Sequence, residues 1–527
     1  MGTPRMLTIN VLSQLSLSIS AQRWGIAGVL AVLGLSLGLI DMAAADPKPH
    51  RTIVTKSGVE VAEYRGVRYA KSPEKQNRWK APVAVTELEI LNEWPPICVQ
   101  DEGNRNWYQA VAEGVGSDAS LIPPTPQISE DCLFLNVWRP RNKNSEKSPV
   151  MVWIHGGGNV GGWSFEPNYR GHELAARGVV VVSIGYRLNV FGFLAHPDLT
   201  AETPYSSSGN YGLLDQLQAL RWVQANIEKF GGDPTNVTIF GESAGAGNVG
   251  YLIASPLANQ LFHKAVIQSG GWPMRQNRTL EQDEADGLAF SEKISLSVAE
   301  LRDIGALDLL KRAQEHYFRG HSALKYDPPV DGWFLPDTPA VRYQHEDLPK
   351  RPVLIGSNEN EHLMYLPDST KTDWETALLA VDERQRPAVD AHLKHLSFRQ
   401  KIDALTTAAD YFCDSIATAN ALMKSASPVY FYRFRKVRPQ AELLGAYHGA
   451  EIPYVFDTHD DWLPTSNADK TLTEEMISRW THFAKTGRLD DTDSWPKWSE
   501  SKKAGLLQDP LLYGALDDSL CSLIAAD

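Results

Sequence analysis

The chain has 527 residues, of which 43% are hydrophobic and 22% are charged, and it contains no low-complexity tract. This composition predicts a large globular protein. The formal net charge of −13 argues against nucleic acid or an anionic membrane as a partner and favours small molecules.

The N-terminal segment has the features of an export signal. Arg23 precedes an apolar run of 17 residues at 24–40, and an alanine triplet at 43–45 follows. Small residues at that place suit cleavage by signal peptidase, so we expect residues 1–45 to be a signal peptide that is removed. The protein would then be exported to the periplasm or the extracellular space, with no membrane span left in it. A membrane anchor is the alternative, because 17 residues lie at the lower limit for a span and the 23 residues before the run are long for a signal.

The rest of the chain shows no internal division. No linker rich in Pro, Gly or Ser, no repeat and no long block of like charge interrupts it. We therefore expect residues 46–527 to form a single domain. The sequence is silent on the oligomeric state.

Export makes disulfides possible, and the chain has four cysteines, Cys98, Cys132, Cys413 and Cys521. Four cysteines allow three pairings, and their positions alone do not choose among them. Because the sequence contains no CxxC and no HExxH motif, the spacing does not fit a zinc site, and no metal is expected.

Short apolar or β-branched runs predict buried strands along the chain. The clearest lie at 148–158, 178–186, 236–243, 351–358 and 428–434. Between the second and the third, apolar residues recur at helical spacing over 212–232, and Gly231 and Gly232 suit the end of this helix. Strands that alternate with helices predict an α/β fold with a large, mostly parallel sheet covered by helices on both faces. In such sheets ligands bind at the carboxyl ends of the strands.

One serine stands at such a strand end. In VTIFGESAGAG, Ser243 lies between Gly241 and Gly245, after a predicted strand and before small residues that lead into a helix. This strand, turn and helix form a nucleophile elbow, which holds its serine in a strained backbone conformation. Side chains at 241 and 245 would collide with the neighbouring strand and helix. A hydroxyl in an ordinary tight turn is the alternative for Ser243.

A serine hydroxyl is a poor nucleophile at neutral pH, so it needs a base, an acid that orients the base, and donors for the oxyanion. The motif HGGG at 155–158 follows the first predicted strand. Its consecutive glycines leave N–H groups unobstructed, so that they can point at a developing negative charge. A flexible turn is the alternative for these glycines.

The base and the acid are less well defined by the residues alone. Among 14 histidines, His448 stands in a loop before an apolar element, whereas His345 and His392 lie in charged stretches. A lone histidine is more often a surface or packed residue than a base. Glu359 and Glu361 both follow the strand at 351–358, and either carboxylate could hold the imidazole in the right tautomer.

The chain resembles the type-B carboxylesterases, the carboxylesterase and cholinesterase branch of the α/β-hydrolases. The resemblance rests on EDCLFLNVW at 130–138, HGGG at 155–158, GYRLNVFGFL at 185–194, the stretch 209–246 around Ser243, QSG at 268–270, DGWFLPDTP at 331–339, GSNENEH at 356–362, AYHGAEIPYVF at 446–456 and the segment 480–498. It covers nearly all of the chain after the signal. It implies an α/β-hydrolase fold with inserted lid and gorge segments, a shortened helical lid at 274–320, and a secreted carboxylesterase of the bacterial type.

The resemblance assigns a role to each residue of a catalytic triad. Ser243 matches the nucleophile, His448 the general base and Glu361 the acid, and only the resemblance selects Glu361 over Glu359. The order serine, acid, histidine is the one expected of this fold.

Further residues take supporting roles by the same resemblance. Gly157, Gly158 and the N–H group of Ala244 match the oxyanion hole, and Ser269 matches a serine that supports the triad acid. The resemblance also implies one disulfide and two buried ion pairs: Cys98 with Cys132, Arg78 with Glu130, and Arg187 with Asp215. A disulfide between Cys413 and Cys521 stays an open possibility.

Several side chains are candidates for contact with the substrate. They are Asn159, Glu242, Trp272 and Trp333, together with Trp107 and Tyr108. Asn159 stands where the family usually has an aromatic residue, which would make that side of the gorge more polar. The aromatic side chains are equally well explained as parts of the core. No residue matches the tryptophan with which cholinesterases receive a quaternary ammonium, so choline esters are not expected as substrates.

The resemblance implies a serine ester hydrolase that works through an acyl-enzyme, without metal or organic cofactor, on a small-molecule ester. The same machinery could act on amides, lactones or bulky natural-product esters such as toxins. A catalytically inactive adhesion or binding protein with this fold is the alternative from another class. Such relatives typically lack the nucleophile, whereas here candidates for the serine, the acid and the base are all present.

Overall fold

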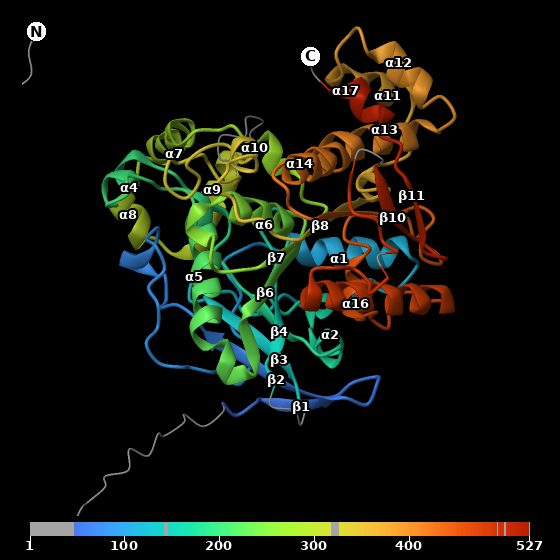
Figure 1. Cartoon of the computed structure of the whole chain (residues 1–527). Helices are drawn as coiled ribbons and strands as arrows, with labels where there is room; N and C mark the ends of the chain where they lie inside the picture. The colour runs from blue at the N-terminus through green and yellow to red at the C-terminus, as the bar shows by residue number, and fades with distance from the viewer. Residues whose placement is uncertain (1–46, 142–145, 318–325, 493, 500–501, 526–527) are drawn as a thin grey trace, which may run out of the picture. The chain divides into compact units, whose positions relative to one another are not determined.

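Apolar segments of the chain pair side by side into one mixed sheet (Figure 1). The computed structural model describes residues 47–141, 146–317, 326–492, 494–499 and 502–525, and within these ranges the sheet has eleven strands. They are β1 (Arg51–Val54), β2 (Glu60–Arg68), β3 (Phe134–Pro140), β4 (Ser148–Ile154), β5 (Val180–Ile184), β6 (Gly232–Glu242), β7 (Lys264–Gln268), β8 (Val353–Asn358), β9 (Val429–Phe434), β10 (Lys503–Leu507) and β11 (Leu512–Ala515). Their order across the sheet is β1-β2-β3-β5-β4-β6-β7-β8-β9-β10-β11. The run from β5 to β10 is parallel, and the outer strands β1, β2, β3 and β11 pair antiparallel.

Both faces of the sheet are apolar. Successive side chains of a strand point to opposite faces, and here both faces are covered by a buried core. In β4, Val150 and Val152 belong to one core, and Met151 and Trp153 belong to the other. Helices α5 (Tyr211–Asn226), α6 (Ala244–Ala254) and α14 (Cys413–Lys424) contribute to the first core. Helices α1 (Gly103–Gly114), α2 (His172–Ala176), α15 (Ile452–Phe456) and α16 (Asn467–Thr486) contribute to the second. The α/β architecture that the sequence predicts, a mostly parallel sheet with helices on both faces, is confirmed.

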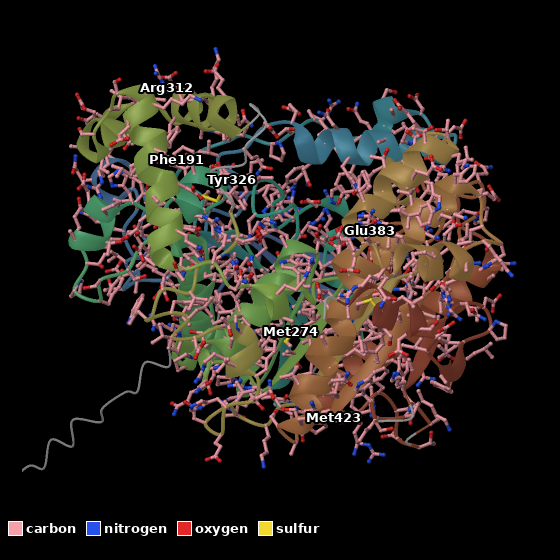
Figure 2. The ribbon with its side chains drawn as sticks, turned by 90° about the horizontal axis from the view of Figure 1, so that it is seen from above. Phe191, Met274, Arg312, Tyr326, Glu383 and Met423 are labelled. Atoms are coloured by element: carbon pink, nitrogen blue, oxygen red, sulfur yellow. A yellow bond between two sulfur atoms is a disulfide. The ribbon has the colours of Figure 1, made fainter. Side chains whose placement is uncertain are left out.

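Two helical insertions interrupt the alternation of strands and helices. Helices α7 (Leu280–Ile294), α8 (Val298–Asp303) and α9 (Ala306–Tyr317) lie between β7 and β8, in the region where the resemblance implies a helical lid. Helices α11 (Lys371–Ala377), α12 (Arg386–His392) and α13 (Phe398–Thr407) lie between β8 and β9 and form a small core of their own with the C-terminal α17 (Ser519–Ile524). The short helices are α3 (Asn189–Phe193), α4 (Pro197–Ala201) and α10 (Pro339–Arg342). Figure 2 shows the side chains from above, with Met274 and Met423 packed against the first core.

The five strands predicted from the sequence correspond to β4, β5, β6, β8 and β9. The predicted strand 148–158 is too long, because the glycines after Ile154 turn away from the sheet instead of pairing. The predicted helix 212–232 corresponds to α5 and a 3-10 turn, Ile227–Phe230, that follows it directly. Gly231 then adopts a left-handed conformation with φ 72°, as a C-terminal glycine cap does.

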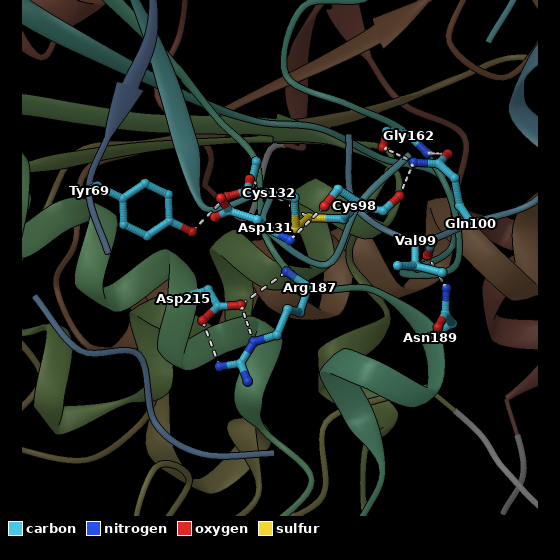
Figure 3. Close-up of a disulfide and its surroundings, with 12 residues drawn as sticks. Tyr69, Cys98, Val99, Gln100, Asp131, Cys132, Gly162, Arg187, Asn189 and Asp215 are labelled. Carbon is cyan, nitrogen blue, oxygen red and sulfur yellow. Dashed lines mark hydrogen bonds and ion pairs between the residues drawn. A yellow bond between two sulfur atoms is a disulfide. The ribbon is translucent and has the colours of Figure 1, made fainter. Parts of the chain in front are cut away.

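One disulfide joins two loops, and a second joins two helices. Cys98 is bonded to Cys132, which is the pairing that the resemblance implies (Figure 3). Cys413, at the start of α14, is bonded to Cys521 in α17. The second bond closes a loop of 108 residues and holds the C-terminal helix against the insertion between β8 and β9.

Each of the two expected ion pairs is present and largely buried. Arg187 Nε lies 2.8 Å from Asp215 Oδ2 and Nη2 lies 2.8 Å from Oδ1, so the pair is bidentate (Figure 3). Their side chains are 4% and 0% exposed. Arg78 Nε donates to Glu130 Oε2 over 2.8 Å, and its Nη1 donates to the carbonyl oxygen of Leu301 in α8 over 2.5 Å. The second pair therefore links the first insertion to the sheet.

The predictions for the N-terminus cannot be compared with the structure. The predicted signal peptide, 1–45, and the alternative of an anchor at 24–40 lie outside the described residues. The boundary at residue 45 therefore stays a prediction, as does the single domain after it. Within the described ranges every helix is too short or too polar to cross a lipid bilayer.

We expect Asp215→Ala to lower the free energy of unfolding by about 3–5 kcal/mol, because it leaves the buried guanidinium of Arg187 without a counter-charge. Urea unfolding followed by circular dichroism measures the change. Glu228→Ala is the matched control, since its partner Lys147 is half exposed and such a pair contributes at most about 1 kcal/mol. Equal losses in the two variants would contradict the structural importance of the buried pair.

Candidate active site

Ser243 lies in a sharp turn between β6 and α6. Its backbone angles are φ 54° and ψ −129°, a conformation that residues other than glycine rarely adopt. The turn is fixed by the Ser243 N–H group, which donates to the carbonyl oxygen of Gln268 over 2.9 Å. The serine is partly exposed and lies at the carboxyl end of a parallel strand, as the elbow motif predicts.

The two glycines of the motif are needed for steric reasons. A Cβ atom at Gly245 would lie 2.0 Å from the carbonyl oxygen of Ile154 at the end of β4. A Cβ atom at Gly241 would lie 2.7 Å from the same oxygen and 2.6 Å from the backbone of Gly245. The predicted collision with the neighbouring strand and helix is confirmed.

Glu361 and His448 are joined by a short hydrogen bond. His448 Nδ1 lies 2.7 Å from Glu361 Oε2, and the other oxygen of Glu361 accepts from the Asn358 N–H group over 2.7 Å. Glu361 follows β8 and is fully buried. Glu359 points elsewhere, since its Oε2 accepts from Arg433 Nε over 2.7 Å. The sequence alone did not decide which of these two glutamates lies beside the histidine, and in the structure it is Glu361.

The other nitrogen of His448 faces a second carboxyl group. Nε2 lies 3.3 Å from Glu242 Oε1, and Glu242 directly precedes Ser243. In the described part of the chain no hydrogen bond joins Ser243 Oγ to His448, although both residues line the same cavity. Glu242, a candidate for substrate contact, therefore lies beside the imidazole.

Burial and charge shift the proton affinities in this cavity. Burial raises the pKa of Glu242 to about 8 and that of Glu166, another carboxyl of the cavity wall, to about 7. Burial alone would lower the pKa of His448, but the carboxylates of Glu242 and Glu361 outweigh it and raise the pKa to about 9. Proton binding to the histidine is thus coupled to its acidic neighbours.

The HGGG loop lies beside the serine turn. Gly157 has φ 100° and Gly158 has φ 62°, and a Cβ atom at Gly157 would lie 2.2 Å from the carbonyl oxygen of Gly161. Both glycines line a cavity with Ser243. Ala244 is the first residue of α6, where N–H groups have no partner within the helix. The candidate oxyanion donors therefore surround the serine from two elements.

Two cavities meet at Ser243. The first, of about 450 Å³, is lined among others by Trp107, Tyr108, Glu166, Glu242, His362, Tyr365 and His448. The second, of about 500 Å³, is lined among others by Ala244, Tyr251, Trp272, Arg275, Asn277 and Arg278. Gly158, Ser243 and Tyr411 line both. The ring of Tyr411 lies 4.9 Å from that of His448 and 5.9 Å from that of Trp272, so it forms the wall between the two spaces.

Three residues predicted for the site do not make the contacts expected of them. Trp333 stacks on Tyr205 with 3.7 Å between ring centroids and lines neither cavity. The side chain of Asn159 is buried and hydrogen-bonded to protein groups, and it lines neither cavity either. The buried hydroxyl of Ser269 has no hydrogen-bond partner among the described residues, so within them it does not contact Glu361 as the resemblance implies.

Other residues of the site gave no signal in the sequence. Tyr411 lies in a π-helical turn, Ala408–Phe412, inside an insertion without a motif. His362 directly follows Glu361, and that adjacency was the only available hint. Among the described residues no group of three or more His, Cys, Asp or Glu side chains could hold a metal ion.

Comparisons with known proteins show what the whole chain is similar to. A model of the carboxylesterase family matches residues 51–509. The chain is 33% identical over 509 residues to a fumonisin B1 esterase of Sphingopyxis macrogoltabida, covering 90% of this chain and 89% of that protein. It is 35% identical over 477 residues to a para-nitrobenzyl esterase of Bacillus subtilis, covering 86% and 92%. A solved structure of a PNB esterase superimposes with a TM-score of 0.75 at 30% identity, covering 91% of this chain and all of that one, which confirms the α/β-hydrolase fold.

We expect Glu242→Gln to lower the pKa of His448, because the variant removes a negative charge 3.3 Å from Nε2 that stabilises the imidazolium. His448 then loses its proton at a lower pH than in the unaltered protein. A ¹³C NMR titration of the histidine rings measures the shift. Glu166→Gln is the control, since Glu166 lines the same cavity but is hydrogen-bonded to Tyr108, and an equal shift in both variants would contradict the assignment.

Proposed function

Because the chain belongs to the type-B carboxylesterase family and is an enzyme of that kind, we propose that Ser243, His448 and Glu361 form the triad with which it hydrolyses carboxylic esters. The observation that carries the proposal is the 2.7 Å hydrogen bond between His448 and the buried Glu361, beside a serine held in a strained turn. Glu361 keeps the imidazole in the tautomer that has its free lone pair on Nε2.

The proposed reaction has two steps. His448 Nε2 takes the proton of Ser243 Oγ while this oxygen attacks the ester carbonyl carbon. The oxyanion accepts hydrogen bonds from the N–H groups of Gly157, Gly158 and Ala244, and the alcohol leaves with the proton from His448. Water then attacks the acyl-enzyme in the same way, releasing the carboxylic acid and restoring the serine.

The proposed mechanism needs a hydrogen bond from Ser243 Oγ to His448 Nε2, and among the described residues His448 Nε2 faces Glu242 instead. Catalytic hydrogen bonds are often loose in the free enzyme and tighten when substrate binds. In the structure, Glu242 Oε1 lies 3.3 Å from His448 Nε2. An ionised Glu242 favours the imidazolium, so the base becomes available as the pH rises through the pKa of His448.

The cavities favour an ester with sizeable groups on both sides of the carbonyl. Volumes of about 450 and 500 Å³ lie on either side of Tyr411, each large enough for a drug-sized fragment. Of the alternative substrates left open by the sequence, bulky natural-product esters fit these spaces best. One relative is named as a fumonisin B1 esterase and the other as a para-nitrobenzyl esterase.

Export belongs to the same proposal. Both disulfides join residues far apart in the sequence, and such bonds persist in oxidising compartments. Together with the apolar run before the alanine triplet, they support a protein that is cleaved after residue 45 and works in the periplasm or outside the cell.

We expect Ser243→Ala to lose at least about a thousandfold in turnover of an ester while its thermal unfolding stays unchanged. The nucleophile is removed, but alanine keeps the backbone of the turn. Mass spectrometry after treatment with an organophosphate should find the label on Ser243 of the unaltered enzyme and none in the variant. Ester turnover near the original rate in Ser243→Ala would sink the proposal.

The two neighbouring glutamates provide a matched pair of variants. Glu361→Gln should lower kcat severely, because an amide cannot stabilise the imidazolium at Nδ1. Glu359→Gln should leave kcat nearly unchanged, since Glu359 pairs with Arg433 and does not contact the histidine. Steady-state kinetics at several pH values measure both, and a stronger defect in Glu359→Gln would reverse the assignment of the acid.

A further inference from the structure

The loop after β4 contains three consecutive residues in the left-handed region. They are Gly157, Gly158 and Asn159, with φ angles of 100°, 62° and 56°. Asparagine tolerates this region better than most residues other than glycine, so Asn159 can continue the turn that the glycines begin. A loop in such a conformation keeps its shape only if contacts outside it hold it there.

The buried amide of Asn159 supplies two of these contacts. Its Oδ1 accepts from Asn248 Nδ2 over 2.9 Å, and its Nδ2 donates to the carbonyl oxygen of Tyr326 over 3.1 Å. Tyr326, labelled in Figure 2, lies in the segment that leads to β8. The backbone oxygen of Asn159 also accepts from the Asn189 N–H group of α3 over 2.6 Å. Three separate elements therefore hold this single residue.

The end of the loop has an anchor of its own. Gln100 Oε1 accepts from the Gly162 N–H group over 2.8 Å, and Gln100 Nε2 donates to the Gly162 carbonyl oxygen over 2.9 Å (Figure 3). Gln100 does not reach the middle of the loop, where Gly157 and Gly158 lie. The contacts of Asn159 are therefore the ones next to these two glycines.

The bond to Asn248 joins the two elements that carry the candidate oxyanion donors. Asn248 lies in α6, the helix that begins with Ala244 directly after Ser243. Gly157 and Gly158 directly precede Asn159 in the loop after β4. An oxyanion hole needs its donors at 2.7–3.1 Å from one oxygen atom, so a small relative shift of loop and helix weakens every bond at once.

We propose that Asn159 is a positioning residue, which holds the Gly157–Gly158 loop in register with α6 through its side-chain amide. The inference rests on the proposed function, since it concerns the geometry of that oxyanion hole. Asn159 lines neither of the two described cavities, so it acts on the transition state through the loop and does not bind the substrate. This differs from the substrate contact expected from the sequence.

Three variants test the inference. Asn159→Gly keeps the left-handed conformation but removes both side-chain bonds, whereas Asn159→Ala removes the bonds and adds backbone strain. Asn248→Ala removes the same bond from the helix side. In all three we expect kcat to fall by about 10- to 100-fold while KM changes by less than about twofold. The affinity for a trifluoromethyl ketone, which mimics the oxyanion, should fall by the same factor as kcat.

A double variant and a control separate this role from a general loss of stability. Asn159→Gly combined with Asn248→Ala should lower kcat no further than the more severe single variant, because both remove one shared bond. Asn210→Ala removes another buried asparagine, which bonds the Pro329 carbonyl oxygen and lines neither cavity. It should lower the melting temperature and leave kcat and the ketone affinity unchanged.

Each outcome decides for or against the inference. A kcat within about twofold of the original in Asn159→Gly, or a raised KM at constant kcat, overturns it. If Asn159→Gly does not fold, unchanged kcat and ketone affinity in Asn248→Ala overturn it instead. Ser243→Ala keeps the two proposals apart: activity in that variant contradicts the triad, whereas an inactive Ser243→Ala beside a fully active Asn159→Gly contradicts only the role of Asn159.

Discussion

The site depends on one close contact, between the first turn of α6 and the carboxyl end of β4. Glycine at 245 lets the helix backbone approach the Ile154 carbonyl oxygen to a distance that leaves no room for a side chain. β4 and β6 are neighbours in the sheet, with Ile154 paired to Gly241, so the turns after both strands begin at the same edge. The strained serine turn and the left-handed glycine loop therefore face each other. The hydrogen bond between Asn159 and Asn248 lies across this contact.

Three carboxyl groups lie close together at the same edge of the sheet, where they would repel one another if all were ionised. Glu242, Glu361 and Glu451 are all buried around His448, and their partners distinguish them. Glu361 accepts from the Asn358 N–H group and faces the imidazole. Glu451 accepts from the side-chain amides of Asn358 and Gln268. Glu242 Oε1 has only the imidazole nearby, and its burial favours the protonated form. Three identical side chains around one imidazole therefore have different hydrogen-bond partners.

Sequence patterns predicted five of the buried strands, β4, β5, β6, β8 and β9, but not β7, which is equally buried between β6 and β8. The inner strands, such as β5 at 180–184, read as continuous apolar runs, whereas the edge strands β1 and β11 are exposed and carry no such signal. The nucleophile elbow could be predicted because its two glycines are required for steric reasons and therefore appear in the sequence. The choice between Glu359 and Glu361 could not be made from the residues alone, because it depends on Arg433 of the adjacent β9, which pairs with Glu359. Trp333 was misplaced for a related reason: an aromatic side chain fits a core stack as well as a substrate wall.

The two cavities have different walls and share only Gly158, Ser243 and Tyr411 among the residues that line them. One wall comes from α1, the loop at 157–161, the segment 166–169 and the turn at 362–365, and the other from 272–278 and α6. An ester has its acyl group on one side of the carbonyl carbon and its alcohol group on the other. Each of these two groups would contact the side chains of a different cavity. Mutations in one wall can then accumulate without disturbing the other. The specificity for the acyl group and that for the alcohol group can therefore change separately during evolution. Protein engineers can likewise randomise the residues of one cavity independently of the other.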